Sequence, residues 1–261
     1  DLAGITTFMT MAYILIVNPN ILSDAGMDRG AVFTATALSA AFATIVMAFL
    51  ANYPIALASG MGLNAYFVYT VAIQHSWQIA LTAVFIEGIL FILLTMTKFR
   101  EAIVNSIPRK VKYAVTVGIG LFIAFIGLKL SGVIVAKDFD LVQLGNVKSI
   151  TVILTFVGIA GTMVMVARKV KGALLWGILG TYALGIICEL TGLYVVNPDA
   201  GMFSLIPSKI IDTPPSLAPV FWKFDFSAAW KMGFDFVVIL FAFLFVDFFD
   251  TVGTLIGVAD K

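Results

Sequence analysis

Two aspartates, Asp247 and Asp250, stand in an otherwise apolar stretch that runs from residue 234 to residue 259. A carboxylate near the centre of a bilayer costs about 2.5 kcal/mol or more, so such a group rarely faces lipid. Three residues apart, the acids fall on one face of a helix, which Thr251 and Thr254 extend at the four-residue spacing. This spacing predicts a polar stripe facing a cavity that holds protons, ions or a polar solute. The alternative is that the acids bond to a neighbouring helix and only join the two helices.

The acids could do two kinds of chemistry. When neutral, a carboxyl group donates a hydrogen bond, and when ionised it accepts two N–H bonds from a purine or pyrimidine. Asp250 therefore suits substrate binding and proton coupling, while Asp247 is either a second coupling acid or the group that orients the first. Glu87, in another apolar stretch, is a third intramembrane acid, for which packing and coupling are the two interpretations.

A break in the apolar residues 53–73 is the second candidate feature. Pro54 opens this segment and Ser59-Gly60-Met61-Gly62 interrupts it, so a continuous helix is not expected. Five extended residues, 54–58, would reach about 16 Å. Residues 62–71 would add about 15 Å as helix. Together these lengths match a hydrocarbon core of about 30 Å, which predicts a crossing that is half strand and half helix, broken near the midplane.

The broken crossing could bind a solute. Unwinding exposes backbone N–H groups at the start of the half-helix, where the positive dipole end attracts electron-rich atoms. Gly60 and Gly62 lack side chains, so a solute could approach the backbone there. Asn64 can bond the edge of a heterocycle through its carbonyl and its NH2, and the adjacent Ala65 is a further candidate contact. The alternative is a glycine kink for tight packing, with Asn64 bonded to another helix.

Composition identifies the environment of these residues. Apolar residues make up 61% of the chain, charged residues 12%, and the mean hydropathy is +1.06. Soluble domains carry about 25% charged residues, so the chain is expected to be an integral membrane protein in contact with the lipid bilayer. With only Cys188 and His75, it offers no internal disulfide, no cysteine metal cluster and no histidine-based metal or triad site. We therefore expect no cysteine- or histidine-based metal site, and our interpretation of the whole chain includes no metal, no cofactor, no nucleic-acid partner and no enzymatic activity.

The apolar runs predict an all-α polytopic protein with eight crossings. Besides the broken third segment they are residues 2–17, 31–50, 77–96, 112–128, 150–166, 173–193 and 233–258. Basic residues in the connections 98–112 and 168–171 predict that these two loops lie in the cytoplasm. Counting crossings from there puts the proline-containing connection 194–231 outside. The chain has no initiator Met and stops just past the acidic stripe, which indicates a fragment.

Three strings support a resemblance. GITTFMTMAYILIVNP, ANYPIALASGMGLNAYFVYT and FVDFFDTVGTLIGVAD closely resemble the AzgA-like hypoxanthine/guanine/adenine permeases, a branch of the nucleobase-cation symporters that include uracil and xanthine permeases. The likeness runs through essentially the whole chain. It implies fourteen segments in two inverted repeats of seven, with a core domain and a gate domain that move like an elevator, and proton-coupled purine uptake across the plasma membrane. A homodimer is a candidate assembly.

The resemblance also implies a domain order and site residues. Residues 1–97 would be core segments one to four, 98–193 gate segments five to seven, 194–231 an extracellular loop, and 232–261 the eighth segment, opening a truncated second repeat. Asn64 matches the family's asparagine on the third segment and Asp250 its eighth-segment acid, with Thr254 one turn further into the site. The family's tenth-segment glutamate has no counterpart before Lys261, so this polypeptide alone is not expected to transport.

Other functions remain open. A related anion transporter, or a uracil or xanthine transporter, has similar architecture, although an anion transporter would favour a basic or neutral residue at position 250. An intramembrane aspartyl protease also needs two aspartates, but on different helices and with one in a Gly-x-Gly-Asp context. Here Phe248 and Phe249 precede Asp250. The choice of purine, and H+ rather than Na+ as the coupling ion, are not fixed by these residues.

Overall fold

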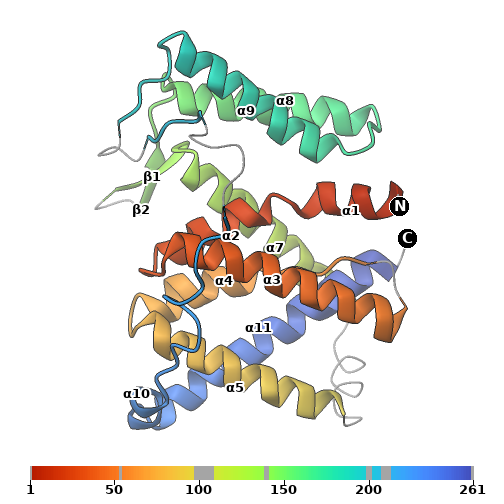
Figure 1. The fold of residues 1–261 in the computed structure, drawn as a ribbon, viewed down its shortest axis with the longest axis vertical. Helices are drawn as coiled ribbons and strands as arrows, with labels where there is room; N and C mark the ends of the chain where they lie inside the picture. Colours follow the sequence, from red (N-terminus) through yellow and green to blue (C-terminus); the bar gives the residue numbers. More distant parts are fainter. Residues whose placement is uncertain are drawn as a thin grey trace. The chain divides into compact units, whose positions relative to one another are not determined.

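The computed structural model describes residues 2–52, 55–96, 109–137, 141–197, 202–206 and 213–259 (Figure 1). Side chains are not described in parts of the helices, among them residues 252–259 of the last helix. Pro54, most of the basic connection 98–112 and the side chain of Thr254 therefore lie outside the described structure, and what the sequence predicts for them stays a prediction.

Helices dominate the fold (Figure 1). In chain order they are α1 (Leu2–Met11), α2 (Ile14–Ser23), α3 (Arg29–Val46), the π-helix η1 (Met47–Ala51), α4 (Met61–Ala65), the π-helix η2 (Tyr66–Ala72), α5 (Trp77–Thr95), α7 (Arg109–Leu130), α8 (Ile150–Ala167), α9 (Ala173–Leu190), α10 (Phe226–Lys231) and α11 (Phe234–Ala259). The π-helical segments were not expected, because a change of hydrogen-bond register leaves no clear mark on hydropathy.

The first expected crossing, residues 2–17, is wrong as a single helix. The chain turns at Ala12 and Tyr13, which separate α1 from α2. Both turn residues are apolar, so hydropathy passes through the turn without a signal. Helix α2 continues to Ser23 with Pro19 buried inside it, and that proline cannot supply a backbone hydrogen bond to the preceding turn.

The expectation for the third segment is confirmed in its helical half. Residues 55–60 belong to no helix and to no strand ladder, and helix begins at Met61 and continues through η2 to Ala72. Residues 55–60 therefore do not form a β-strand that pairs with another strand. Gly60 itself is extended, with φ −71° and ψ 121°. Helix α4 and η2 together form the half-helix. Helix α5 follows, and Ser76 caps the first turn of α5 by accepting from Ile79 N–H at 3.3 Å.

Two short elements depart from the all-α expectation. Strands β1 (Ile134–Lys137) and β2 (Leu141–Leu144) form an antiparallel hairpin in which Ile134 pairs with Leu144. β-branched and apolar residues in both strands favour this pairing over a plain loop. In the connection 194–231, α10 forms where Asp225 caps the helix by accepting from Ala228 N–H at 2.8 Å.

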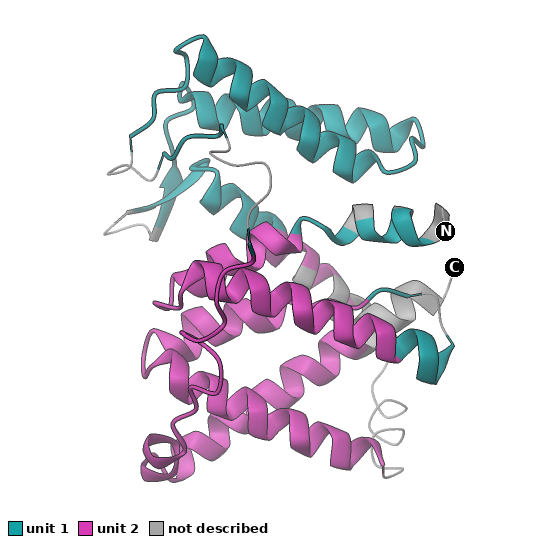
Figure 2. Ribbon diagram, in the orientation of Figure 1, with its two compact units in different colours: residues 1–13, 47–56, 124–213 teal, residues 14–46, 57–123, 214–261 magenta. Residues whose placement is uncertain are grey.

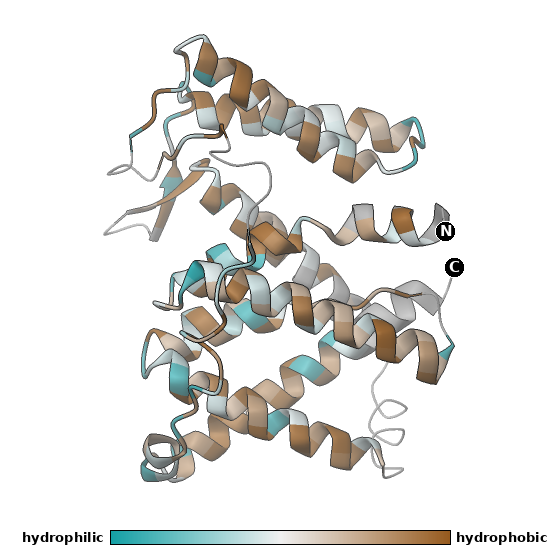
Figure 3. Ribbon diagram, in the orientation of Figure 1, coloured by the Kyte–Doolittle hydropathy of each residue, from teal (hydrophilic) through white to brown (hydrophobic). Residues whose placement is uncertain are grey.

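The lengths and composition of the helices fit a membrane. Four described helices are long and apolar enough to cross one: Arg29–Ala51, Trp77–Thr95, Ile150–Ala167 and Ala173–Leu190. Figure 3 shows that hydrophobic residues cover most of the helical ribbon, with short hydrophilic stretches on α5 and α11. On α3 and η1, Phe42 and Phe49 are 71% and 84% exposed, as expected for side chains that face lipid. The other predicted crossings, and the repeat architecture, stay predictions.

The chain divides into two compact units (Figure 2). One comprises residues 1–13, 47–56 and 124–213, and the other residues 14–46, 57–123 and 214–261. The second unit brings together α2, α3, the half-helix, α5 and α11, which carry the predicted site residues. Its core includes Phe243 of α11, fully buried with its ring 5.1 Å from that of Tyr66 in an edge-on arrangement. The assignment of core and gate domains stays a prediction.

Candidate functional site

The broken segment is held in place by a side chain from α3. The hydroxyl of Thr44 accepts from Leu57 N–H at 3.0 Å and donates to Leu57 C=O at 3.3 Å. Backbone groups that leave a helix inside a membrane need partners from protein or from water. Thr44 supplies both for Leu57, so one hydroxyl stabilises the extended approach to the half-helix.

The start of the half-helix lies against the acidic helix. A Cβ atom added to Gly60 would overlap the Oδ2 atom of Asp250. The backbone angles of Gly60 are open to any residue, so its lack of a side chain matters for space rather than for conformation. Helix α11 packs on α4, and this contact places the Asp250 carboxyl beside the first turn of the half-helix. The two features that the sequence singled out, the break and the acid, therefore meet.

Asn64 is positioned by hydrogen bonds from its own amide group. Its Nδ2 donates to Asn18 Oδ1 at 2.5 Å and to Ser59 Oγ at 3.3 Å. Asn18, on α2, is 4% exposed, and its own Nδ2 donates to Thr36 Oγ1 at 2.7 Å. Thr36, on α3, donates in turn to the carbonyl oxygen of Val32 at 2.7 Å.

The direction of these bonds determines which end of Asn64 remains available. The Val32 carbonyl can only accept, so the Thr36 hydroxyl must donate to it and accept from Asn18. Asn18 then offers its oxygen to Asn64, whose NH2 must be the donor. The carbonyl oxygen of Asn64 has no hydrogen-bond partner among the described residues. The site thus presents an acceptor, and its orientation follows from the backbone of α3.

The remaining predicted residues differ in their surroundings. A Cβ added to Gly62 would meet nothing within 4 Å, so there is open space beside this backbone. Ala65 is 1% exposed, and protein covers its methyl group. Thr254 belongs to α11, but its side chain lies outside the described structure. The assignment of Gly62, Ala65, Asp250 and Thr254 to substrate binding stays a prediction, as does a coupling role for Asp247.

The third intramembrane acid, Glu87, lies on α5, a helix that packs against α11, which carries Asp247. Glu87 is 3% exposed, and its Oε1 atom has no hydrogen-bond partner among the described residues. In the described part of the chain, no group of three or more His, Cys, Asp or Glu side chains could hold a metal ion.

Three polar residues of this site were missed from the sequence: Asn18, Thr36 and Thr44. The first carries a usable signal, because Asn18-Pro19-Asn20 interrupts an apolar run, and a polar side chain at such a place needs a partner. Threonines at positions 36 and 44 carry no comparable signal. Most threonines in apolar helices bond to their own helix, as Thr82 does to the Gln78 carbonyl.

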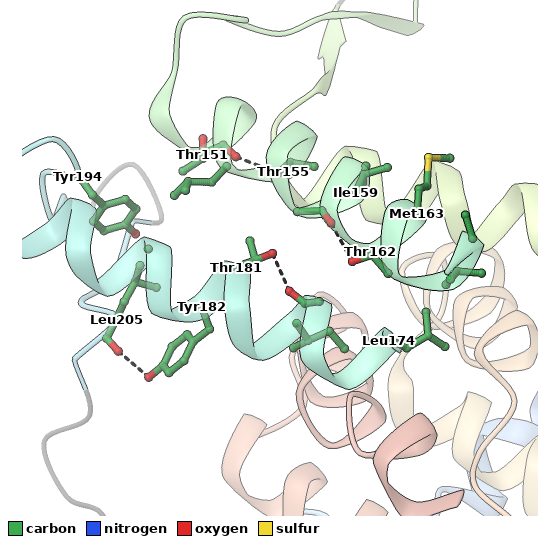
Figure 4. A pocket seen from close by; sticks show the side chains of 17 residues that line it. Thr151, Thr155, Ile159, Thr162, Met163, Leu174, Thr181, Tyr182, Tyr194 and Leu205 are labelled. Carbon is green, nitrogen blue, oxygen red and sulfur yellow. Dashed lines mark hydrogen bonds between the residues drawn. The ribbon is translucent and has the colours of Figure 1, made fainter. Parts of the chain in front are cut away.

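A separate groove lies in the other unit, between α8 and α9 (Figure 4). It has a volume of about 910 Å³, and none of its lining residues is charged. The hydroxyls of Thr162 and Thr181 donate to carbonyl oxygens of their own helices, at 2.7 Å each. A polar ligand would find few free partners here. Helices α8 and α9 approach each other closely at these threonines, because a Cβ on Gly177 would overlap Thr162 and one on Gly158 would overlap Thr181.

Comparison with known proteins relates these features to a family. The Xan_ur_permease model, which describes a permease family, matches residues 2–261. A Methanocaldococcus jannaschii protein named as a permease, MJ0326, is 50% identical over 262 residues, covering 100% of this chain and 57% of the relative. The guanine/hypoxanthine permease PbuG of Bacillus subtilis is 42% identical over 271 residues, covering 100% and 59%. The adenine permease AdeP of Escherichia coli is 40% identical over 262 residues, covering 100% and 55%.

This chain therefore spans little more than half the length of these curated relatives. The match extends over essentially all of its residues, and the apolar helices fit a multi-pass membrane protein. The chain belongs to the permease family.

Proposed function

We propose that the complete protein takes up a purine nucleobase by proton symport across the cell membrane. Relatives named for guanine and hypoxanthine, and others named for adenine, support a purine substrate. The family is one of transporters, so no enzymatic activity is proposed. The two acids of the stripe lie on the single helix α11, which argues against an intramembrane aspartyl protease, whose acids sit on two helices.

The approach of the Asp250 carboxyl to Gly60, at the start of the half-helix, is the observation that carries this proposal. A purine offers N–H groups and ring nitrogens along its edge, and it can meet a carboxyl, a carbonyl and backbone N–H groups in one plane. Asp250 supplies the first and Asn64 supplies the second. Open space beside Gly62 would admit the edge of the base. A carboxylate paired to N–H groups of the base would recognise it by charge-assisted hydrogen bonds.

Proton coupling follows from the same acid. An ionised Asp250 in the closed site would have to cross the membrane interior as a charge, which is costly. Binding one proton removes that charge, and the neutral acid can then donate to a ring nitrogen of the base. Binding of the substrate and binding of the proton would then both depend on the Asp250 side chain. For the movement we propose an elevator-type mechanism, supported by the division of the chain into two compact units and by the family resemblance.

The test is uptake of radiolabelled hypoxanthine, guanine, adenine and uracil by cells that lack purine permeases and produce the complete protein. We expect uptake of at least one purine, inhibition by a protonophore, and little uptake of uracil. Absence of both purine uptake and purine binding would overturn the proposal.

Asp250→Asn is the variant that addresses mechanism. The amide keeps the size of the side chain but can neither ionise nor carry the coupled proton, so we expect purine uptake to fall roughly tenfold to a hundredfold, the order of a lost charge-assisted bond. Asp235→Asn, an exposed acid on the same helix, is the matched control and should transport normally. Normal, pH-dependent uptake by Asp250→Asn, at equal amounts in the membrane, would mean that this acid is only structural.

A further inference from the structure

The connection between α9 and α10 ends in a segment that lies against two helices of the site. Residues 214–225 belong to no helix or strand, but they fall in the same compact unit as α3, α5 and the half-helix. Figure 1 shows this segment as a trace that passes α3 and ends at α10. Long connections without regular structure are uncommon in compact proteins and often have a function. The contacts that fix this one are therefore informative.

One contact fixes the segment to α3. The buried hydroxyl of Thr34 donates to the carbonyl oxygen of Pro215 at 2.9 Å. Threonines inside helices commonly donate to their own helix, whereas this one donates to the connection. One turn earlier, a Cβ atom added to Gly30 would lie 2.9 Å from the Cβ atom of Pro215. The missing side chain of Gly30 thus lets the proline ring lie directly on α3.

A second contact fixes the segment to α5. Thr82 is fully buried, and its hydroxyl accepts from Asp225 N–H at 2.9 Å. Near it on the same helix, the ring of Phe85 lies 4.7 Å from that of Phe224 and 6.2 Å from that of Trp222. A buried hydrogen bond and a cluster of aromatic rings therefore hold the end of the segment on α5.

The two helices joined in this way belong to different sides of the candidate site. Helix α3 packs on α2, which contacts α4 and supplies the bond that positions Asn64. Helix α5 packs on η2 and on α11, which carries Asp250. A shift of α3 relative to α5 would change the spacing between the Asn64 carbonyl and the Asp250 carboxyl. A ligand that bonds to both groups needs that spacing to be fixed.

We propose that residues 214–225 form an external brace that ties α3 to α5, keeps the two sides of the purine site at a fixed spacing and stays closed throughout transport. The brace moves together with the unit that carries the site. The inference rests on the proposed function, because purine is the ligand whose binding the brace supports. The opposite device is a latch, whose contact with α3 opens each time that substrate enters or leaves.

A disulfide between α3 and the brace distinguishes these two devices. The complete protein would carry Gly30→Cys and Pro215→Cys with Cys188→Ala, and any further cysteine would be replaced. Disulfides hold Cβ atoms about 3.5–4.5 Å apart, so a small shift from 2.9 Å suffices to form the bond. We expect oxidation to cross-link the pair, as seen by peptide mapping. Uptake of labelled purine should stay within a factor of about two of that of the reduced protein, because no step of transport requires the brace to open.

Thr34→Val tests whether the brace supports purine binding. Valine cannot donate to the Pro215 carbonyl, so the brace loses its bond to α3. We expect the Kd of the purine, measured by competition binding, to rise roughly twofold to tenfold, the worth of one neutral hydrogen bond. The same substitution in the cross-linked cysteine variant should bind as well as the cross-linked protein with Thr34, because a covalent bond replaces the lost contact.

Controls separate the brace from general effects of substitution. Each cysteine variant alone should be insensitive to oxidation. Thr155→Val removes a hydroxyl that donates only to the Thr151 carbonyl of its own helix, at 2.8 Å, and should leave the Kd unchanged. If Thr34→Val does not reach the membrane, the cysteine pair decides alone.

The outcomes have distinct meanings. Normal uptake by the cross-linked protein, with affinity lost in Thr34→Val and regained on cross-linking, supports the brace. Uptake that stops on oxidation and returns with a reductant means a latch and overturns it. Failure to cross-link, or an unchanged Kd in Thr34→Val, also overturns it, while the proposed function stands. If the wild type neither binds nor takes up purine, the proposed function fails, and the role of the brace fails with it.

Discussion

At the scale of single residues, the site depends on the space and the hydrogen-bonding groups that particular residues leave available. Gly60 leaves room for a carboxyl, and Asn64 leaves a carbonyl oxygen without a partner in the described structure. Neither property could be read from residue type alone. A glycine can serve a kink, a packing contact or a ligand, and an asparagine can point either end of its amide toward a solute.

Gly60→Ala tests the first of these properties. The added methyl would overlap Asp250 Oδ2, so the carboxyl must move away from the half-helix. Loss of one hydrogen bond to a charged group is worth about 1.5–3 kcal/mol, so the Kd of the purine should rise roughly tenfold to a hundredfold. Gly88→Ala, where a Cβ meets nothing within 4 Å, is the control and should bind normally. Unchanged affinity in Gly60→Ala, measured by competition binding, would mean that the contact is unimportant for the substrate.

Thr36→Val tests the orientation of Asn64. Without the Thr36 hydroxyl, the buried amide of Asn18 loses its acceptor, and its link to Asn64 no longer has a fixed direction. An unpaired buried donor costs about 1–3 kcal/mol, so both purine affinity and thermal stability should fall. Thr36→Ser keeps the hydroxyl and should restore the affinity. Equal binding by the Val and Ser variants would contradict the ordered series of hydrogen bonds.

At the scale of elements, the sequence predicted the interruption of the third segment and the acidic face of the last helix, because Gly, Pro and Asp are conspicuous in an apolar chain. It did not predict the turn between α1 and α2, where Ala12 and Tyr13 continue the apolar pattern. Nor did it predict which helix supports the break. The supporting hydroxyl comes from Thr44, and only the packing of α3 beside the segment brings it to Leu57.

Thr44→Val should therefore weaken the broken segment. Both backbone groups of Leu57 lose their partner, at a cost of about 1–3 kcal/mol for each group that water cannot reach. We expect a lower melting temperature in detergent and faster amide hydrogen exchange in residues 55–60. Ser at position 44 retains the hydroxyl and serves as the control. If Thr44→Val exchanges at the wild-type rate, the segment is held by other contacts.

At the scale of the whole molecule, the charges of the loops predict which ends of the helices face the cytoplasm. Lys171 lies in a basic connection assigned to the inside, and Lys223 in the connection assigned to the outside. Both side chains are exposed, which makes them a matched pair of reporters.

In a Cys188→Ala background of the complete protein, Lys223→Cys should react with a membrane-impermeant maleimide in intact cells. Lys171→Cys should react only after the cells are opened. The reverse pattern would invert the proposed topology, and labelling of both positions from outside would mean that the number of crossings between them is wrong. Cys188 has to be removed because it is partly exposed and is the one cysteine of this sequence, and any cysteine elsewhere in the complete protein is replaced in the same background.

The hydrogen bonds that begin at the Val32 carbonyl have a consequence for selectivity. No side-chain substitution can turn a main-chain oxygen into a donor. The helical backbone of α3 therefore fixes that Asn64 presents an acceptor and needs a donor from its ligand. In the proposed binding mode, a nucleobase alkylated at the nitrogen that faces Asn64 would bring a methyl group where a hydrogen is required. Such bases should be refused even though their rings are the right size and shape.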